Sequence, residues 1–90
     1  MMSQIIHSQA NAQEKEQCQG WDLWESGNAK HFEYSYSQDV HFVVQRGEAV
    51  IHSATNAPVS ISPGSHVTIC KGVVGVWEIS SPIINRYQYL

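Results

Sequence analysis

Positive charge is scarce in this chain of 90 residues. Five Lys and Arg residues stand against eight Asp and Glu residues, which gives a formal net charge of -3 at pH 7 with His neutral. A protein that binds a nucleic-acid backbone needs clustered basic side chains to neutralise successive phosphates. The composition offers no such cluster, and we expect no nucleic-acid partner.

Cysteine and long hydrophobic runs are also nearly missing. Cys18 and Cys70 are the only two cysteines and lie far apart in the sequence, so neither a disulfide scaffold nor a zinc ribbon is indicated. No segment approaches the roughly 20 apolar residues that span a bilayer. The first residues, MMSQIIHSQ, lack the basic and apolar regions of a signal peptide. We therefore expect a reduced, cytoplasmic protein without a membrane partner.

What the sequence does contain is the composition of one small globular domain, with 42% hydrophobic and 14% charged residues. Segments of β-branched and aromatic residues alternate with Gly and Pro turns, a pattern typical of a sandwich or barrel. A stretch rich in Ala, Gln, Glu and Lys at 9–17 favours a surface helical segment. The predicted strands are 5–7, 32–36, 40–45, 48–53, 58–62, 67–70, 75–80 and 83–89.

Three turn signals, Arg46-Gly47, Pro63-Gly64 and Lys71-Gly72, fall between these strands. If the first is a two-residue hairpin turn, alternation places one apolar set inside the fold and brings His41 opposite His52 on the outer face. The residues predicted to point inward are Phe42, Val44, Ala49, Ile51, Val59, Ile61, Val67, Ile69, Gly75, Trp77 and Ile79.

Some apolar side chains are left over on the outer faces of these strands. A chain of this size buries only roughly 60 to 65% of its unfolded surface, and a partner subunit would cover the excess. We therefore expect a homodimer. The outer residues concerned are Val43, Val50, Val74 and Val76.

The second half of the chain carries a more specific pattern. The segment 63–72, PGSHVTICKG, with the Gly75-Val76-Trp77 that follows, resembles the second motif of small single-domain cupins of the ureidoglycine-aminohydrolase-like group. Residues 21–25, 32–34, the Gly47 turn and the closing residues 86–90 are similar to the same group. The resemblance implies an all-β cupin jelly-roll barrel of antiparallel strands over residues 21–90. Residues 1–20 would form a strand and a short helical segment that pack on it.

Metal-dependent cupins hold an ion inside the barrel through a His-x-His pair, a Glu and one further His. Counted from the glycines, these positions fall on Tyr34, Tyr36, Val40 and Gly75. None of the four supplies the imidazole or carboxylate that a divalent ion prefers. We therefore expect no metal and no cofactor in the cup. The metal-dependent reactions of the relatives do not transfer on fold similarity alone.

Aromatic residues are predicted to face the cup interior instead, beside a gap at Gly75, with Trp21 and Trp24 as a hydrophobic lid. The rings would suit a small apolar or planar ligand that phenol hydroxyls orient. They would equally fill a small barrel, and the size of the chain favours a filled or nearly filled interior. The candidate ligand-binding residues are Tyr34, Tyr36, Phe42 and Trp77.

Other chemistry-bearing residues have simpler interpretations. The His41/His52 pair supplies only two ligands and makes an incomplete metal site. Cys70 at a strand end is either an inert buried thiol or a reactive one. His66 is expected on the outer surface.

The leading hypothesis is a metal-free cupin that binds a small molecule, with any catalytic residues unknown. One alternative is a cupin enzyme acting on a small nitrogenous or sugar-like metabolite with a non-standard metal or none. Another is a structural or dimerisation domain with a filled barrel. A cavity of roughly 300 Å³ or more beside Trp77 would count against this last alternative.

Overall fold

A computed structural model describes residues 4–90, and the structural statements below concern this range. Strands dominate it, and a short helix stands near the position expected from the sequence. No helix in this range is long and apolar enough to cross a membrane. In chain order the elements are β1 (Ile5–Gln9), α1 (Ala12–Gln17), the 3-10 helix η1 (Cys18–Gly20), β2 (Asp22–Glu25), β3 (His31–Ser35), β4 (Val40–His52), β5 (Val59–Ile61), β6 (Ser65–Ile69) and β7 (Val74–Tyr89).

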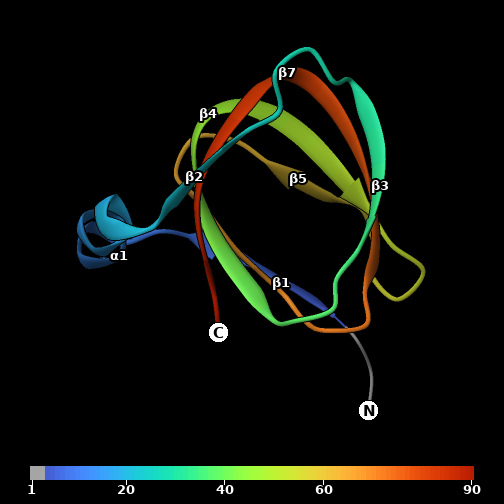
Figure 1. Cartoon of the computed structure of the whole chain (residues 1–90), viewed down its shortest axis with the longest axis horizontal. Coiled ribbons are helices and arrows are strands. Elements are labelled where there is room, and N and C mark those ends of the chain that lie inside the picture. Colours follow the sequence, from blue (N-terminus) through green and yellow to red (C-terminus); the bar gives the residue numbers. More distant parts are fainter. Residues whose placement is uncertain (1–3) are drawn as a thin grey trace.

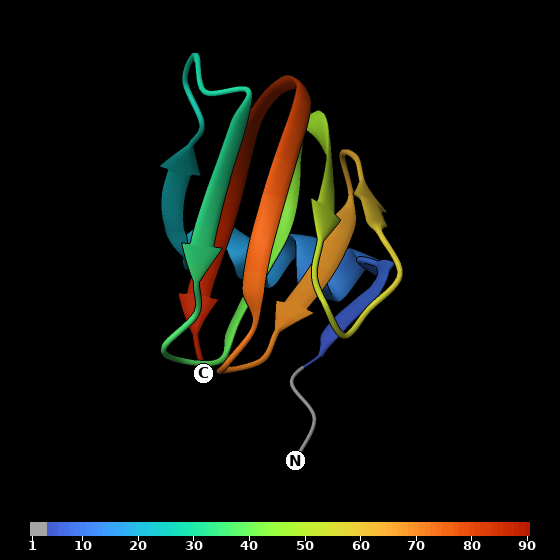
Figure 2. The same cartoon turned by 90° about the vertical axis from the view of Figure 1, so that its right-hand side faces the viewer.

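The strands form one antiparallel sheet in the order β1-β6-β4-β7-β2, with β3 paired to β7 and β5 paired to β4. The sheet curls into a cup, and α1 lies outside it (Figure 1). The long strand β7 turns back on itself at the top of the barrel (Figure 2). Its first half pairs with β3 and its second half with β2, while β4 follows both halves. The predicted all-β barrel with a short N-terminal helix is confirmed.

The hairpin predicted at Arg46-Gly47 is wrong. β4 continues through both residues, with register shifts against β7 at this point. Gly47 has φ 90°, and a Cβ on it would collide with the carbonyl oxygen of Pro82 in β7. Both strands bend here, and only glycine combines this backbone conformation with so close an approach. His41 and His52 consequently stand at opposite ends of one strand instead of facing each other.

The predicted interior is otherwise confirmed. Phe42, Val44, Ala49 and Ile51 are all 3% exposed or less. The turns at Pro63-Gly64 and Lys71-Gly72 are also present, each with its glycine at positive φ. The remaining predicted inward residues are buried, apart from the half-buried Val59: Ile61, Val67, Ile69, Gly75, Trp77 and Ile79.

Val43 was predicted to lie on an outer face, but it is buried. Ala10, Cys18 and Trp21 of the N-terminal segment pack over it. The chain's own N-terminal segment, and not a partner subunit, therefore covers this part of the sheet.

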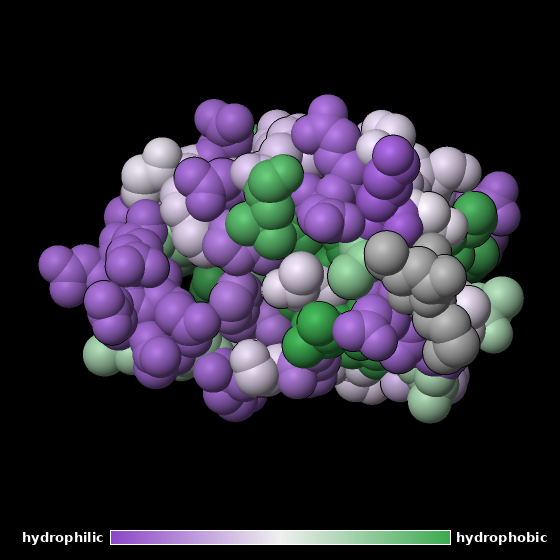
Figure 3. Space-filling view, turned by 90° about the horizontal axis from the view of Figure 1, so that it is seen from below, coloured by the Kyte–Doolittle hydropathy of each residue, from purple (hydrophilic) through white to green (hydrophobic). Residues whose placement is uncertain are grey.

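The other outer valines are less covered: Val50 and Val76 are half-buried and Val74 is 46% exposed. On the face seen from below, hydrophobic residues form separate small groups among polar ones (Figure 3). The homodimer stays a prediction.

Candidate functional site

The barrel interior keeps a cavity of about 160 Å³. This is about half of the roughly 300 Å³ at which typical ligand pockets begin, so side chains fill most of the cup without closing it. All four residues of the predicted ligand-binding set contribute to its wall. The lining residues are Trp24, Phe32, Tyr34, Tyr36, Val40, Phe42, Trp77, Asn85, Tyr87 and Tyr89.

Strand register brings the rings of β3 and β7 together. Phe32 is paired with Trp77 and Tyr34 with Gly75. Side chains on one face of β3 therefore lie beside the inward-facing residues of β7. Tyr36 follows β3 and is held at both ends of its backbone. Its N–H donates to the Val73 carbonyl at 2.9 Å, and its own carbonyl accepts from the Gly72 N–H at 2.8 Å.

Trp77 stands at the centre of the aromatic wall. Its ring is stacked on Phe32, with centroids 5.4 Å apart and planes 16° apart. Phe42 and Trp24 contact it at 5.7 Å and 5.8 Å in tilted arrangements. Trp24, expected as part of a lid, is therefore part of the cup wall.

The four residues that the resemblance to cupins placed at metal-binding positions gather at this cavity. Tyr34, Tyr36 and Val40 line it, and Gly75 lies beside Tyr36. The gap expected at Gly75 is absent, because a Cβ there would meet the Tyr36 ring at 3.3 Å and Ile51 at 3.5 Å. Within residues 4–90, no group of three or more His, Cys, Asp or Glu side chains is arranged to hold a metal ion.

Tyr36 is half-buried in the cup, and its hydroxyl contacts Trp77. The hydroxyl oxygen accepts a hydrogen bond from Trp77 Nε1 at 3.1 Å. Burial raises the pKa of Tyr36 from 10.0 to about 12, although the hydrogen bond from Trp77 acts in the opposite direction. The phenol is therefore neutral near physiological pH and keeps its hydrogen as a donor.

Two further tyrosines stand at the exposed side of the cavity. Tyr34 and Tyr89 are 47% and 50% exposed. Desolvation, and the charge and hydrogen bond of Tyr34, raise the pKa of Tyr89. The Tyr34 ring meets Tyr36 edge-on at 4.7 Å. Phenol groups thus continue from the solvent into the cup.

Asn85 is the polar lining residue that the sequence reasoning missed. It is only 4% exposed, and its Oδ1 has no hydrogen-bond partner among the described residues. Its backbone is paired with Trp24 on one side and Val44 on the other, so its position is fixed. Counting every second residue along β7 from the buried Ile83 places Asn85 on the inward face. A polar Asn at an inward position was the sequence signal that could have identified it. Leaving a buried acceptor unpaired costs about 1–3 kcal/mol.

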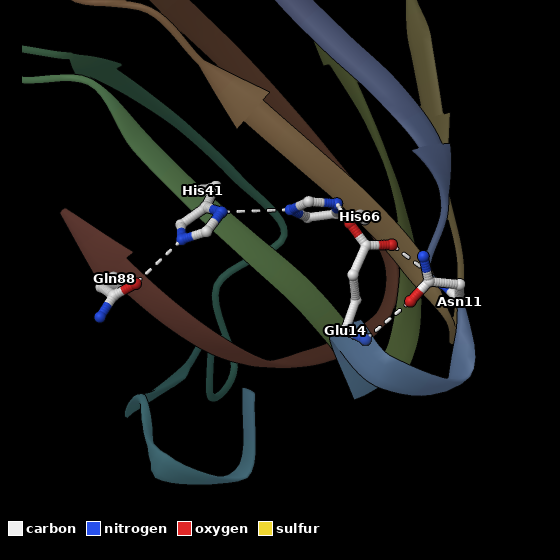
Figure 4. A network of polar contacts seen from close by, with 5 residues as sticks. All are labelled: Asn11, Glu14, His41, His66 and Gln88. Atoms are coloured by element: carbon white, nitrogen blue, oxygen red, sulfur yellow. Dashed lines mark hydrogen bonds and ion pairs between the residues drawn. The ribbon is translucent and has the colours of Figure 1, made fainter. Parts of the chain in front are cut away.

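A second polar cluster, the outer network, lies outside the barrel and consists of Glu14, His66, His41 and Gln88 (Figure 4). Glu14 Oε2 lies 2.9 Å from His66 Nδ1. His66 Nε2 is 3.2 Å from His41 Nδ1, and His41 Nε2 is 3.1 Å from Gln88 Oε1. Glu14 also forms a capping box with Asn11 at the start of α1. The network joins α1 to β6, β4 and β7.

The sequence reasoning misplaced the histidines of this network. His41 partners His66 instead of His52, and Trp21 packs on the His41 ring at 4.2 Å, outside the barrel. His52 meets Glu78 at 2.5 Å. No residue of the outer network lines the cup.

The two cysteines differ in environment. Cys18 is fully buried, and its Sγ donates to the Lys15 carbonyl at 3.1 Å. Cys70 is half-buried and is a free thiol. Neither lines the cup, so whether Cys70 is inert or reactive stays open.

Comparisons with known proteins support the fold alone. No family model matches the chain, and no match was found among curated proteins. The fold is similar to the crystal structure of a DUF861 family protein from Thermotoga maritima, with a TM-score of 0.87 and 17% sequence identity. The likeness covers 97% of this chain and 100% of that one. The chain thus has a cupin-like fold, while its place in the ureidoglycine-aminohydrolase-like group stays a prediction.

Proposed function

We propose that this cupin-like domain binds a small molecule in its aromatic cup. The observation that carries the proposal is a partly open cavity lined by aromatic rings, with one buried carboxamide, that of Asn85, in its wall. The Oδ1 of this amide is enclosed and has no partner among the described residues. Nearly all buried polar groups in native proteins have a hydrogen-bond partner. A ligand whose donor reaches Asn85 Oδ1 would supply the missing one. The volume of about 160 Å³ is close to that of an apolar cavity known to accept benzene, about 150 Å³.

The lining residues favour ligand binding over catalysis. It consists of indoles, phenols, aliphatic and phenyl groups and one amide, and Tyr36 with a pKa of about 12 is a weak acid. An enzyme acting on a small nitrogenous or sugar-like metabolite stays an alternative. The acid–base groups of the outer network would have to act away from this cavity.

The filled-barrel alternative also stays, because the cavity is smaller than a typical ligand pocket. Under that alternative the cup excludes every compound, and the domain acts through its surface. Direct binding measurements separate the two.

The tryptophans provide the experiment. Trp24 and Trp77 line the cup, whereas Trp21 packs outside on His41. In the Trp21→Phe variant, all tryptophan fluorescence comes from the cup. We expect phenol or 2-pyridone to change this fluorescence saturably, after correction for the absorbance and emission of the added compound, with one molecule bound per chain.

The matched control replaces both cup tryptophans with Phe and keeps Trp21. Its fluorescence should not respond to the same compounds. A folded Trp21→Phe protein that shows no saturable change with any of them, up to millimolar concentrations, would overturn the proposal and favour a filled barrel.

A further inference from the structure

The cup offers no counter-charge to a ligand. Among residues 4–90, the ten that line it include no Lys, Arg, His, Asp or Glu. An ion that enters such a site loses its hydration without a partner of opposite charge, which is strongly unfavourable. The lining therefore favours an uncharged ligand.

Aromatic rings can also hold cations over their faces, but the central rings of this cup already pack on one another. Trp77 is stacked on Phe32 and also touches Trp24 and Phe42. Tyr36 is edge-on to Tyr34. A flat ring that extends this packing suits the wall better than a compact ammonium group.

Two polar groups of the cavity wall, those of Asn85 and Tyr36, can orient such a ring. Asn85 belongs to the cavity wall, and its Oδ1 is an enclosed, unpartnered acceptor; a carboxamide places an acceptor and a donor side by side. The Tyr36 hydroxyl, which accepts from Trp77 Nε1, has its own hydrogen to donate. The complementary ligand edge carries an adjacent donor and acceptor.

We infer that the ligand of the cup is a small, uncharged, planar ring with a lactam-like edge, held by the Asn85 amide among the aromatic side chains. The inference rests on the proposed function and adds the chemical class of the ligand. A ring of about six or seven heavy atoms matches the volume, since benzene occupies an engineered cavity of similar size.

A series of ring compounds tests the class on the native chain by calorimetry and on the Trp21→Phe protein by fluorescence. 2-Pyridone has both donor and acceptor, N-methyl-2-pyridone lacks the donor, benzene lacks both, and N-methylpyridinium and benzoate carry opposite charges. Dissociation constants come from the fluorescence of the Trp21→Phe protein and from calorimetry. We expect 2-pyridone to bind about tenfold more tightly than N-methyl-2-pyridone, the effect of one hydrogen bond to a buried group, and the two ions to bind most weakly.

Two substitutions assign the preference to a residue. Asn85→Leu should abolish the difference between 2-pyridone and its N-methyl derivative and improve benzene binding. The control is Asn56→Ala. Asn56 lies outside the cup and bonds the backbone of Ile5 through both ends of its amide, at 2.9 Å and 3.3 Å. This variant should keep the tenfold preference.

The possible failures are distinguishable. If benzene binds and 2-pyridone has no advantage, or if N-methylpyridinium binds tightest, the cup still binds ligands but the inferred class is wrong. If Asn85→Leu keeps the tenfold preference, Asn85 is not the recognising group and the inference is overturned. If no compound of the series binds, the proposed function itself fails.

Discussion

The outer and inner faces of the sheet differ in whether their polar side chains have hydrogen-bond partners. On the outer face, polar side chains form a continuous chain of contacts from Glu14 through His66 and His41 to Gln88. On the inner face, Asn85 stands among rings with its Oδ1 unpaired. Solvent is close to the outer groups and would satisfy any unpaired atom cheaply, yet they are paired. The buried Oδ1 of Asn85, for which an unmade hydrogen bond is expensive, has no partner among the described residues, and neither has Ser53 Oγ, which does not line the cup. This contrast supports the proposal that the cup binds a ligand.

The largest difference between the faces is expected when one large ring is removed from each. Trp77→Ala should lower the free energy of unfolding by about 3–5 kcal/mol, because it opens a large cavity in the core. Trp21→Ala on the outer face should cost less, since Trp21 is half-buried. Urea denaturation of both variants measures the two values. Equal losses would show that the cup wall is no better packed than the outer face.

On the inner face, Tyr36 is expected to make the stability of the fold depend on pH. Its pKa is raised from 10.0 to about 12 in the folded chain, so the folded state retains a proton that the unfolded state releases. The resulting stability is fully present below pH 10 and is lost as the pH rises towards 12. Two pKa units correspond to about 2–3 kcal/mol.

The Tyr36→Phe variant isolates this effect from the other tyrosines. Its free energy of unfolding should fall less steeply than that of the native chain between pH 10 and 12, when both are measured by denaturant titration. Identical slopes would mean that the Tyr36 phenol ionises as easily in the cup as in water.

Substitutions of two asparagines are expected to change the free energy of unfolding by intermediate amounts and in opposite directions. Asn85→Leu should raise the free energy of unfolding by about 1–2 kcal/mol, because it removes an unpaired buried acceptor. Asn56→Ala should lower it by a similar amount, because it removes two hydrogen bonds to the backbone of Ile5. Thermal and denaturant unfolding check both. A destabilised Asn85→Leu variant would indicate that the Asn85 amide has a structural partner in solution.

The smallest effect is expected in the outer network. His66→Ala removes contacts to Glu14 and His41, and a partly exposed ion pair contributes about 0–1 kcal/mol. Ligand affinity in the cup should stay within a factor of two of the native value. A tenfold loss of affinity in the fluorescence titration would show that the two faces are coupled.

The sequence predicted which side chains face inward even where its turn was wrong. A two-residue hairpin turn and the irregular pairing around Gly47 both shift the alternation by one position, so Phe42, Val44, Ala49 and Ile51 fall inside either way. Local periodicity does not distinguish a sharply bent strand from two strands joined by a turn. The bend became visible only from the approach of Pro82 to Gly47.

The candidate site was predictable in part. The aromatic set followed from alternation and from the resemblance to cupins. Alternation along β7 also predicts that Asn85 faces inward. Its significance depends on the missing hydrogen-bond partner of Oδ1, which only the folded structure shows. The contact of His66 with Glu14 could not be predicted, because it depends on how α1 docks on the sheet.

The most direct test of a ligand-binding cup compares the side-chain amides of Asn85 and Asn56 by NMR during a titration with 2-pyridone. The amide signals of Asn85 should move saturably, while those of Asn56 and the ring signals of His41 and His66 stay in place. Asn85 signals that stay fixed up to millimolar 2-pyridone, or shifts confined to the outer network, would contradict the account.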